Sequence, residues 1–224
     1  GFALPDTGLI TFTDMLGHVG RTAAAAPGFP IIADGDTGYG NAMNVYRTVT
    51  EYARAGAAAI LIEDQVWPKK CGHYGGARAV ISAPEARMKI RAAVDARKER
   101  DIVIVARTDA RSAHGMDEAM ARCRAFVDEG ADVVFIEALE SASEMRLFAS
   151  SFPATWANMM PKTPPLPLTE LTAMGFSFVT YNVVLAAAAK AMQDALAALA
   201  ANDMAALPSL MPFDELTELV GLND

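Results

Sequence analysis

Two carboxylates and three glycines follow an apolar run near the N-terminus of the chain. Asp34 and Asp36 come shortly after residues 30–32, in the segment Asp-Gly-Asp-Thr-Gly-Tyr-Gly at 34–40. Hard cations such as Mg²⁺ need only one or two protein carboxylates, because water and substrate oxygens complete the coordination shell. The alternative is a glycine-rich turn in which Asp36 caps the following helix, since Asp and Gly are common in turns and caps.

Further acids follow other apolar runs. Glu63 and Glu137 each come directly after a four-residue apolar run. Carboxylates gathered at one place repel one another unless a cation neutralises them. If these runs are neighbouring strands, Asp34, Asp36 and Glu63 are candidate metal ligands, and this interpretation outweighs the turn-and-cap alternative.

A long glycine-rich segment follows Glu63 and contains Lys69, Lys70, Cys71 and His73. Its length is typical of a loop that closes over a substrate. Cationic neighbours favour the thiolate form of a cysteine and attract carboxylates. The alternative is a solvent-exposed loop with an incidental cysteine. A zinc site is not indicated, because Cys71 and His73 have no second ligand pair at matching spacing.

Arg107 stands near the end of a further apolar run, in the segment Arg-Thr-Asp at 107–109. A guanidinium there could bind a substrate carboxylate through two parallel hydrogen bonds. A salt bridge from Arg107 to Asp109 or Glu137 is the alternative, and both interactions can hold together. Cys123 lies on an apolar helical stripe, which predicts a position in the core.

The elements that must position these residues recur along the chain as a unit of amphipathic helix, glycine and short apolar strand. Helical patterns end at Gly56, Gly130 and Gly175, and each is followed by an apolar run. Runs without polar alternation are buried on both faces, as in a parallel sheet covered by helices. We therefore expect an α/β fold, with six strands at or near residues 30–32, 59–62, 102–105, 133–136, 156–157 and 176–179.

Polar residues at the strand ends favour a barrel over an open sheet. In a (β/α)₈ TIM barrel the C-terminal ends of the strands converge on one mouth, where active sites lie. No glycine-rich nucleotide motif marks an open-sheet site. A complete barrel has eight strands, so we expect the first two to be absent from this sequence. Residues 1–224 are then one barrel domain with a C-terminal helical segment at about 183–224.

Composition limits the function classes. The formal net charge is −8 and the sequence pI is about 4.9, which disfavours nucleic acid and anionic membranes as partners. Two cysteines are too few for a disulfide framework and fit a cytoplasmic protein. The alanine-rich stretch at 183–201 carries Lys190, Gln193 and Asp194, so we expect a surface helix there and not a membrane span.

Taken together, these segments resemble the isocitrate lyase/phosphoenolpyruvate mutase superfamily. The residues at 34–40 look like its metal-binding segment, those at 63–65 and 69–73 like its gating loop, and those at 107–110 like a further signature. The resemblance runs from Leu4 to Leu216. It implies a Mg²⁺-dependent α/β barrel, with Mn²⁺ as a substitute, that forms a homotetramer and exchanges its last helices between subunits.

The resemblance also implies roles for individual residues. Asp34, Asp36 and Glu63 would hold the metal. The substrate would be bound by Arg107, Glu137, Asn158 and the backbone of Gly72. Cys71 would be the general acid of the lyase branch, with Lys69, His73 and Arg107 assisting catalysis.

In that branch the C2–C3 bond of a 2-hydroxy acid is broken, and the enolate-like product is then protonated. The expected reaction is cleavage of a substituted malate to pyruvate or glyoxylate and a second carboxylic acid. No arginine follows Arg146, and a third substrate carboxylate without a cationic partner would be costly to bury, which disfavours tricarboxylates. Asn182, which stands where most of these lyases have proline, leaves oxaloacetate hydrolysis or decarboxylation as an alternative. A non-catalytic, degenerate barrel is a third hypothesis.

Overall fold

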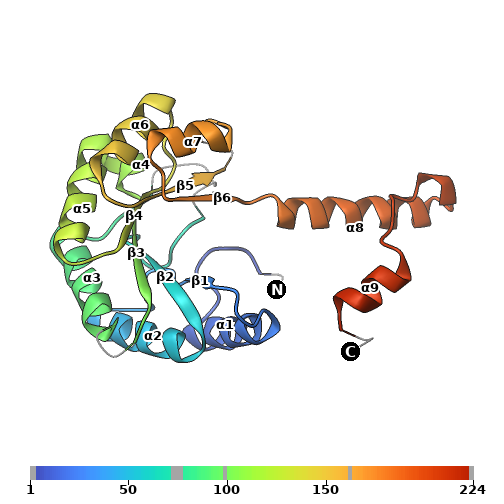
Figure 1. Ribbon diagram of the computed structural model, residues 1–224, viewed down its shortest axis with the longest axis horizontal. Coiled ribbons are helices and arrows are strands. Elements are labelled where there is room, and N and C mark those ends of the chain that lie inside the picture. Colours follow the sequence, from blue (N-terminus) through green and yellow to red (C-terminus); the bar gives the residue numbers. More distant parts are fainter. Residues whose placement is uncertain (1–3, 72–77, 98–99, 161–162, 222–224) are drawn as a thin grey trace. The chain divides into compact units, whose positions relative to one another are not determined.

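The structure is a computed structural model that describes residues 4–71, 78–97, 100–160 and 163–221 (Figure 1). The chain forms two compact units, Gly1–Tyr181 and Asn182–Asp224. The first unit holds every candidate site residue, and the second is helical. The expectation of one barrel domain over residues 1–224 stays a prediction.

Six parallel strands form one sheet in the first unit, in the order β1-β2-β3-β4-β5-β6. Each strand pairs with the next one along the chain, and the sheet curls like part of a (β/α)₈ barrel (Figure 1). The α/β fold and the six expected strands are confirmed. Their bounds are β1 Ile31–Asp34, β2 Ala57–Glu63, β3 Val103–Thr108, β4 Val133–Ile136, β5 Thr155–Met159 and β6 Phe178–Tyr181.

The helices of the first unit cover the convex face of this sheet (Figure 1). Their bounds are α1 Phe12–Ala25, α2 Ala42–Arg54, α3 Ala83–Arg97, α4 Ala110–His114, α5 Met116–Asp128, α6 Ala142–Ser151 and α7 Leu168–Met174. The helical patterns that end at Gly56, Gly130 and Gly175 predicted α2, α5 and α7, whereas no pattern predicted α1, α4 or α6. Local capping stabilises the start of two of these unpredicted helices: Thr11 with Asp14 forms a capping box at α1, and Ser141 accepts a hydrogen bond from the Glu144 amide at α6.

Successive strand residues point to opposite faces of the sheet, and each face carries a cluster of buried apolar side chains. Ile60 and Ile62 of β2 join the large core between sheet and helices, as does Cys123 of α5, whose predicted core position is confirmed. Leu61 points the other way, into a smaller cluster on the concave face. That inner cluster consists of Leu61, Val105, Val133, Phe135 and Trp156.

The second unit contains α8 Val184–Ala200, the 3₁₀ helix η1 Met204–Ala206 and α9 Phe213–Leu219. Ala198 is the buried residue of α8, and large apolar side chains such as Leu185 and Phe213 are exposed. Within the described ranges, no helix combines the length and apolar character needed to cross a membrane.

Two glycines in the first unit allow a matched test of close packing. Gly38 has φ +82°, and a Cβ there would lie 2.3 Å from Cγ2 of Val45, whereas Gly28 has φ +80° with nothing within 4 Å. Alanine at either site meets the left-handed penalty of about 1–2 kcal/mol. At Gly38 the clash should add about 1–3 kcal/mol. We expect Gly38→Ala to lower the free energy of unfolding in urea more than Gly28→Ala does, and equal losses would contradict the packing at Val45.

Candidate active site

Charged and polar side chains continue the inner face of the sheet at the C-terminal ends of its strands. Because side chains alternate along a strand, Glu63 lies on the same face as Leu61, Arg107 on that of Val105, and Asn158 on that of Trp156. Glu63 and Arg107 are register partners across β2 and β3. Alternation therefore brings these predicted site residues to one mouth.

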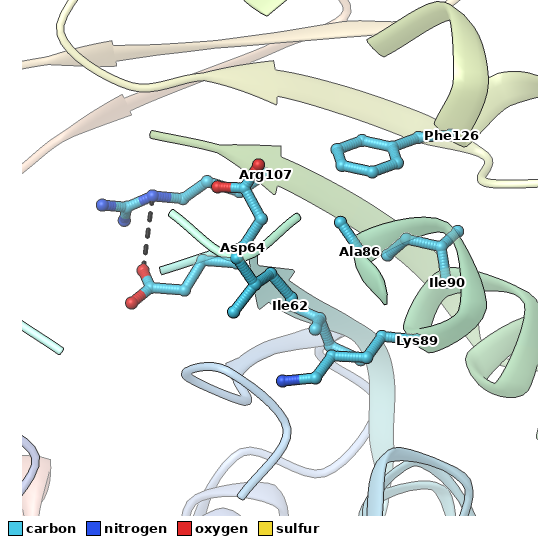
Figure 2. Close-up of a pocket in the computed structure, with 9 residues that line it drawn as sticks. Ile62, Asp64, Ala86, Lys89, Ile90, Arg107 and Phe126 are labelled. Carbon is cyan, nitrogen blue, oxygen red and sulfur yellow. Dashed lines mark ion pairs between the residues drawn. The ribbon is translucent and has the colours of Figure 1, made fainter. Parts of the chain in front are cut away.

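Arg107 is surrounded by carboxylates. Its Nε and Nη2 donate to the two oxygens of Asp109, each at 2.9 Å. Nε lies 3.4 Å from Oε2 of Glu63, the ion pair drawn in Figure 2, and Nη1 lies 3.7 Å from Oε2 of Glu137. The guanidinium also stands over the ring of Phe135, 5.4 Å from its centroid. The salt bridges expected as an alternative to a substrate clamp are thus present.

Glu63 is almost fully buried. Burial raises the pKa of Glu63 to about 8, although the neighbouring Arg107 charge lowers it. Its Oε1 has no hydrogen-bond partner among the described residues. A second positive charge beside Glu63 would therefore stabilise its ionised form.

Asp109 is fully buried and is shared by two arginines. Besides Arg107 it pairs with Arg78, whose Nε lies 3.0 Å from Oδ1 of Asp109. Arg78 stands where the loop after β2 returns to the sheet, beside the bridge between Gln65 and Val80. The base of that loop and Arg107 are thus held by one carboxylate.

Asp34 and Asp36 lie beside Glu63 because the turn after β1 continues the pairing with β2. The amide of Asp36 donates to Oδ1 of Asp34 at 2.8 Å, and the amide of Glu63 donates to the carbonyl of Asp36 at 2.8 Å. Asp36 has φ +47°, a left-handed conformation that is unusual for a residue with a side chain. The structure brings the three predicted metal ligands into one neighbourhood.

Lys69 approaches this group from the following loop. Its Nζ lies 2.7 Å from Oδ1 of Asp36 and also pairs with Asp6. Burial would lower the pKa of Lys69, but the charges of Asp34 and Asp36 outweigh it and raise that pKa. Burial and the Asp34 charge raise the pKa of Asp36 despite the ion pair with Lys69. Asp34, Asp36, Asp6 and Lys69 border a cavity of about 240 Å³.

These acids fit a hard divalent cation with few protein ligands. Among the described residues, no group of three His, Cys, Asp or Glu side chains is arranged to hold a metal ion. Mg²⁺ does not require one, since one or two carboxylates with water and substrate oxygens suffice. The unpartnered Oε1 of Glu63 and the repulsion between the like charges of Asp34 and Asp36 are features that a bound cation would relieve.

Cys71 is half-buried, and its amide donates to the carbonyl of Asp6 at 3.2 Å. This hydrogen bond places the start of the loop beside the Asp6–Lys69 ion pair. Gly72 and His73, predicted for substrate binding and catalysis, lie outside the described residues.

Asn158 is oriented by a short chain of hydrogen bonds. Trp156 Nε1 donates to Oγ1 of Thr180 at 2.9 Å, and that hydroxyl donates to Oδ1 of Asn158 at 3.0 Å. The accepting oxygen of Asn158 is thereby engaged. Thr180 was not predicted as a site residue, although its place two residues after Phe178 on β6 could have indicated it.

Comparisons with known proteins identify the family of the chain. A family model described as phosphoenolpyruvate phosphomutase matches residues 2–200. The chain is 46% identical to the 2,3-dimethylmalate lyase of Eubacterium barkeri, over 97% of this chain and 77% of that protein.

Two solved structures are similar along almost the whole chain. One is oxaloacetate acetylhydrolase with 3,3-difluorooxalacetate, with a TM-score of 0.91, 33% identity and coverage of 100% of this chain and 77% of that one. The other is phosphonopyruvate hydrolase with oxalate and Mg²⁺, with a TM-score of 0.84, 31% identity and coverage of 99% and 79%. With its family model, its relative and its curled parallel sheet in agreement, the chain belongs to the phosphoenolpyruvate mutase/isocitrate lyase superfamily.

Proposed function

We propose that this protein is a Mg²⁺-dependent carbon–carbon lyase that cleaves a substituted malate to pyruvate or glyoxylate and a second carboxylic acid. The observation that carries the proposal is the meeting of Asp34, Asp36 and Glu63 with Lys69 and Arg107 at one end of the sheet. The 46% identity to a 2,3-dimethylmalate lyase supports a substituted malate as substrate.

The cation would be held by Asp34 and Asp36, with Glu63 beside it, and Mn²⁺ could replace Mg²⁺. When bound, Mg²⁺ supplies positive charge that favours the oxyanion developing on the substrate. The Mg²⁺ in the similar phosphonopyruvate hydrolase supports this assignment.

The chain's own residues would bind and orient the acid. Arg107 would bind a carboxylate through the N–H groups that Asp109 leaves available, because Asp109 occupies only its Nε and one Nη2 hydrogen. Asn158 would contribute to substrate binding from an orientation that its hydrogen bond with Thr180 fixes. Glu137 and the Gly72 backbone would complete substrate binding. A dry, enclosed mouth would protect the carbanion-like product from water.

A second candidate function is hydrolysis or decarboxylation of oxaloacetate. The structural similarity to oxaloacetate acetylhydrolase, with a TM-score of 0.91, supports this second function. Cys71 supports the lyase, because we take that cysteine as the acid that protonates the released enolate. A barrel without catalytic activity is the third possibility, and any turnover would exclude it.

The homotetramer with exchanged C-terminal helices also remains a proposal. Exposed apolar residues on α8 and α9, such as Leu185, Leu196 and Phe213, support burial of these helices against another subunit. A cytoplasmic location is likewise a proposal.

A substrate screen with Mg²⁺ separates the candidate reactions. A lyase should release pyruvate or glyoxylate with a second acid from substituted malates such as 2,3-dimethylmalate. A hydrolase should release oxalate and acetate from oxaloacetate, and a decarboxylase pyruvate and CO₂. Chromatography of the products distinguishes these outcomes, and activity on oxaloacetate alone would contradict the lyase.

Cys71→Ser tests the general acid. A hydroxyl is a far weaker acid than a thiol, and general acid catalysis contributes about 10²–10⁴-fold. We expect kcat to decrease by about 10²–10⁴-fold, while oxalate binding in the presence of Mg²⁺ is unchanged. Cys123→Ser is the matched control for loss of a thiol, because Cys123 is buried in the core away from the mouth. A near-normal kcat with a raised KM would limit Cys71 to packing the loop.

A further inference from the structure

Lys89 is a buried lysine that no step above uses. It lies on α3 and is 5% exposed, although lysine is almost never buried without a partner. Its Nζ donates to the backbone carbonyl of Thr37 at 3.1 Å, a hydrogen bond that is itself buried. In Figure 2 the Lys89 side chain runs from α3 alongside Ile62, at the edge of a water-sized cavity of about 10 Å³ that Glu63 and Arg107 also line.

The carbonyl that Lys89 binds belongs to the turn that presents Asp36. The turn is strained, because Asp36 and Tyr39 have positive φ angles of 47° and 59°. Such a conformation persists only where the surroundings fix it. Lys89 is one such contact, and a weaker one is the hydroxyl of Thr48, which lies 3.3 Å from the carbonyl of Gly38 and shares its hydrogen with the carbonyl of Asn44 at 2.9 Å.

A lysine is a costly choice for this position. Removing an ammonium group from water carries a large desolvation cost, whereas an apolar side chain would fill the same space without it. Its aliphatic stem packs near Ile62 and Ile90 of the core, so packing alone does not require the charge. Nζ donates to the Thr37 carbonyl, and this hydrogen bond explains why a donor stands there.

The hydrogen bond of Lys89 explains the buried position of its ammonium group better than its charge does. Lys69 forms the 2.7 Å ion pair with Asp36 and supplies the positive charge that acts on it. The carboxylates whose charges act on Lys89 are Glu85 and Asp64. Lys89 therefore reaches Asp36 through the backbone of the turn.

We propose that Lys89 is a positioning residue of the cation site, which fixes the turn bearing Asp36 by holding the Thr37 carbonyl. The proposal rests on the proposed Mg²⁺ site and goes beyond it, because Lys89 touches neither the cation nor the substrate. Removing a residue that orients a metal ligand typically weakens metal binding by about 10–100-fold.

Calorimetric titration of the 224-residue chain with Mg²⁺ tests the proposal. Lys89→Met removes the donor and keeps an unbranched side chain, and we expect it to weaken Mg²⁺ binding by about 10–100-fold. Arg91→Met is the matched control, because Arg91 lies on the same helix with an exposed side chain and pairs with Glu129. Asp36→Asn is the positive control for loss of a ligand.

The sign of the change separates positioning from charge. If Lys89 acted only as a positive charge near the acids, its removal would leave Mg²⁺ binding unchanged or tighten it, and either result would overturn the proposal. Hydrogen–deuterium exchange of the metal-free protein gives a second measurement. Peptides with the amides of Gly38 and Glu63, which hold the turn, should exchange faster in Lys89→Met, while β5 and β6 should not change. Unchanged exchange at the turn, or equal acceleration everywhere, would overturn it too.

Neither measurement needs a substrate. A wild-type chain that binds Mg²⁺ but cleaves no malate would refute the lyase and leave Lys89 to be decided by these titrations. A wild-type chain that binds no Mg²⁺ would overturn the role of Lys89. If Lys89→Met failed to fold, Lys89→Leu, which also lacks the donor, would provide both measurements.

Discussion

Negative charge buried at the C-terminal ends of the strands is the constraint on which this site depends. Asp36, Glu63, Asp109 and Glu137 are each at most 7% exposed. A buried carboxylate without compensation costs several kcal/mol, so the fold must bring cations to the same place. Arg107 does this from within the sheet, while Lys69 comes from the following loop. The raised pKa of Glu63, near 8, indicates that this compensation is incomplete, which is the electrostatic reason to expect a further cation at the mouth.

The sequence predicted the part of this site that depends on strand periodicity. Unbroken apolar runs indicated strands buried on both faces, and alternation then fixes which residues face inward. Glu63, Arg107 and Asn158 follow from that rule because each stands two residues beyond an inward apolar residue on its own strand. Asp36 was predictable for a different reason, since its neighbouring glycines allow a turn to return the chain to the sheet.

The partners of these residues could not be predicted in the same way. Arg122 donates to Asp64 at 3.0 Å across 58 positions of sequence, and Lys89 reaches Thr37 across 52. The position of each residue along its own helix indicates at most which face of that helix it occupies. Which distant carboxylate or carbonyl they meet depends on how α3 and α5 pack against the sheet, and no local pattern encodes that distance. For the same reason the sharing of Asp109 by Arg107 and Arg78 emerges only from the folded chain.

The pairing of Arg107 with Asp109 limits the positive charge that the mouth of the sheet can offer to an anionic substrate. Arg107 already stands among Asp109, Glu63 and Glu137, three carboxylates within 4 Å of one guanidinium. A substrate carboxylate would add a fourth negative charge, and like charges this close disfavour one another's ionised forms. A divalent cation held by Asp34 and Asp36, as proposed, would offset this negative charge, and so would a proton retained by a carboxyl of raised pKa such as Glu63. If the proposed site holds Mg²⁺, the repulsion among these buried acids favours binding of the metal before the acid substrate.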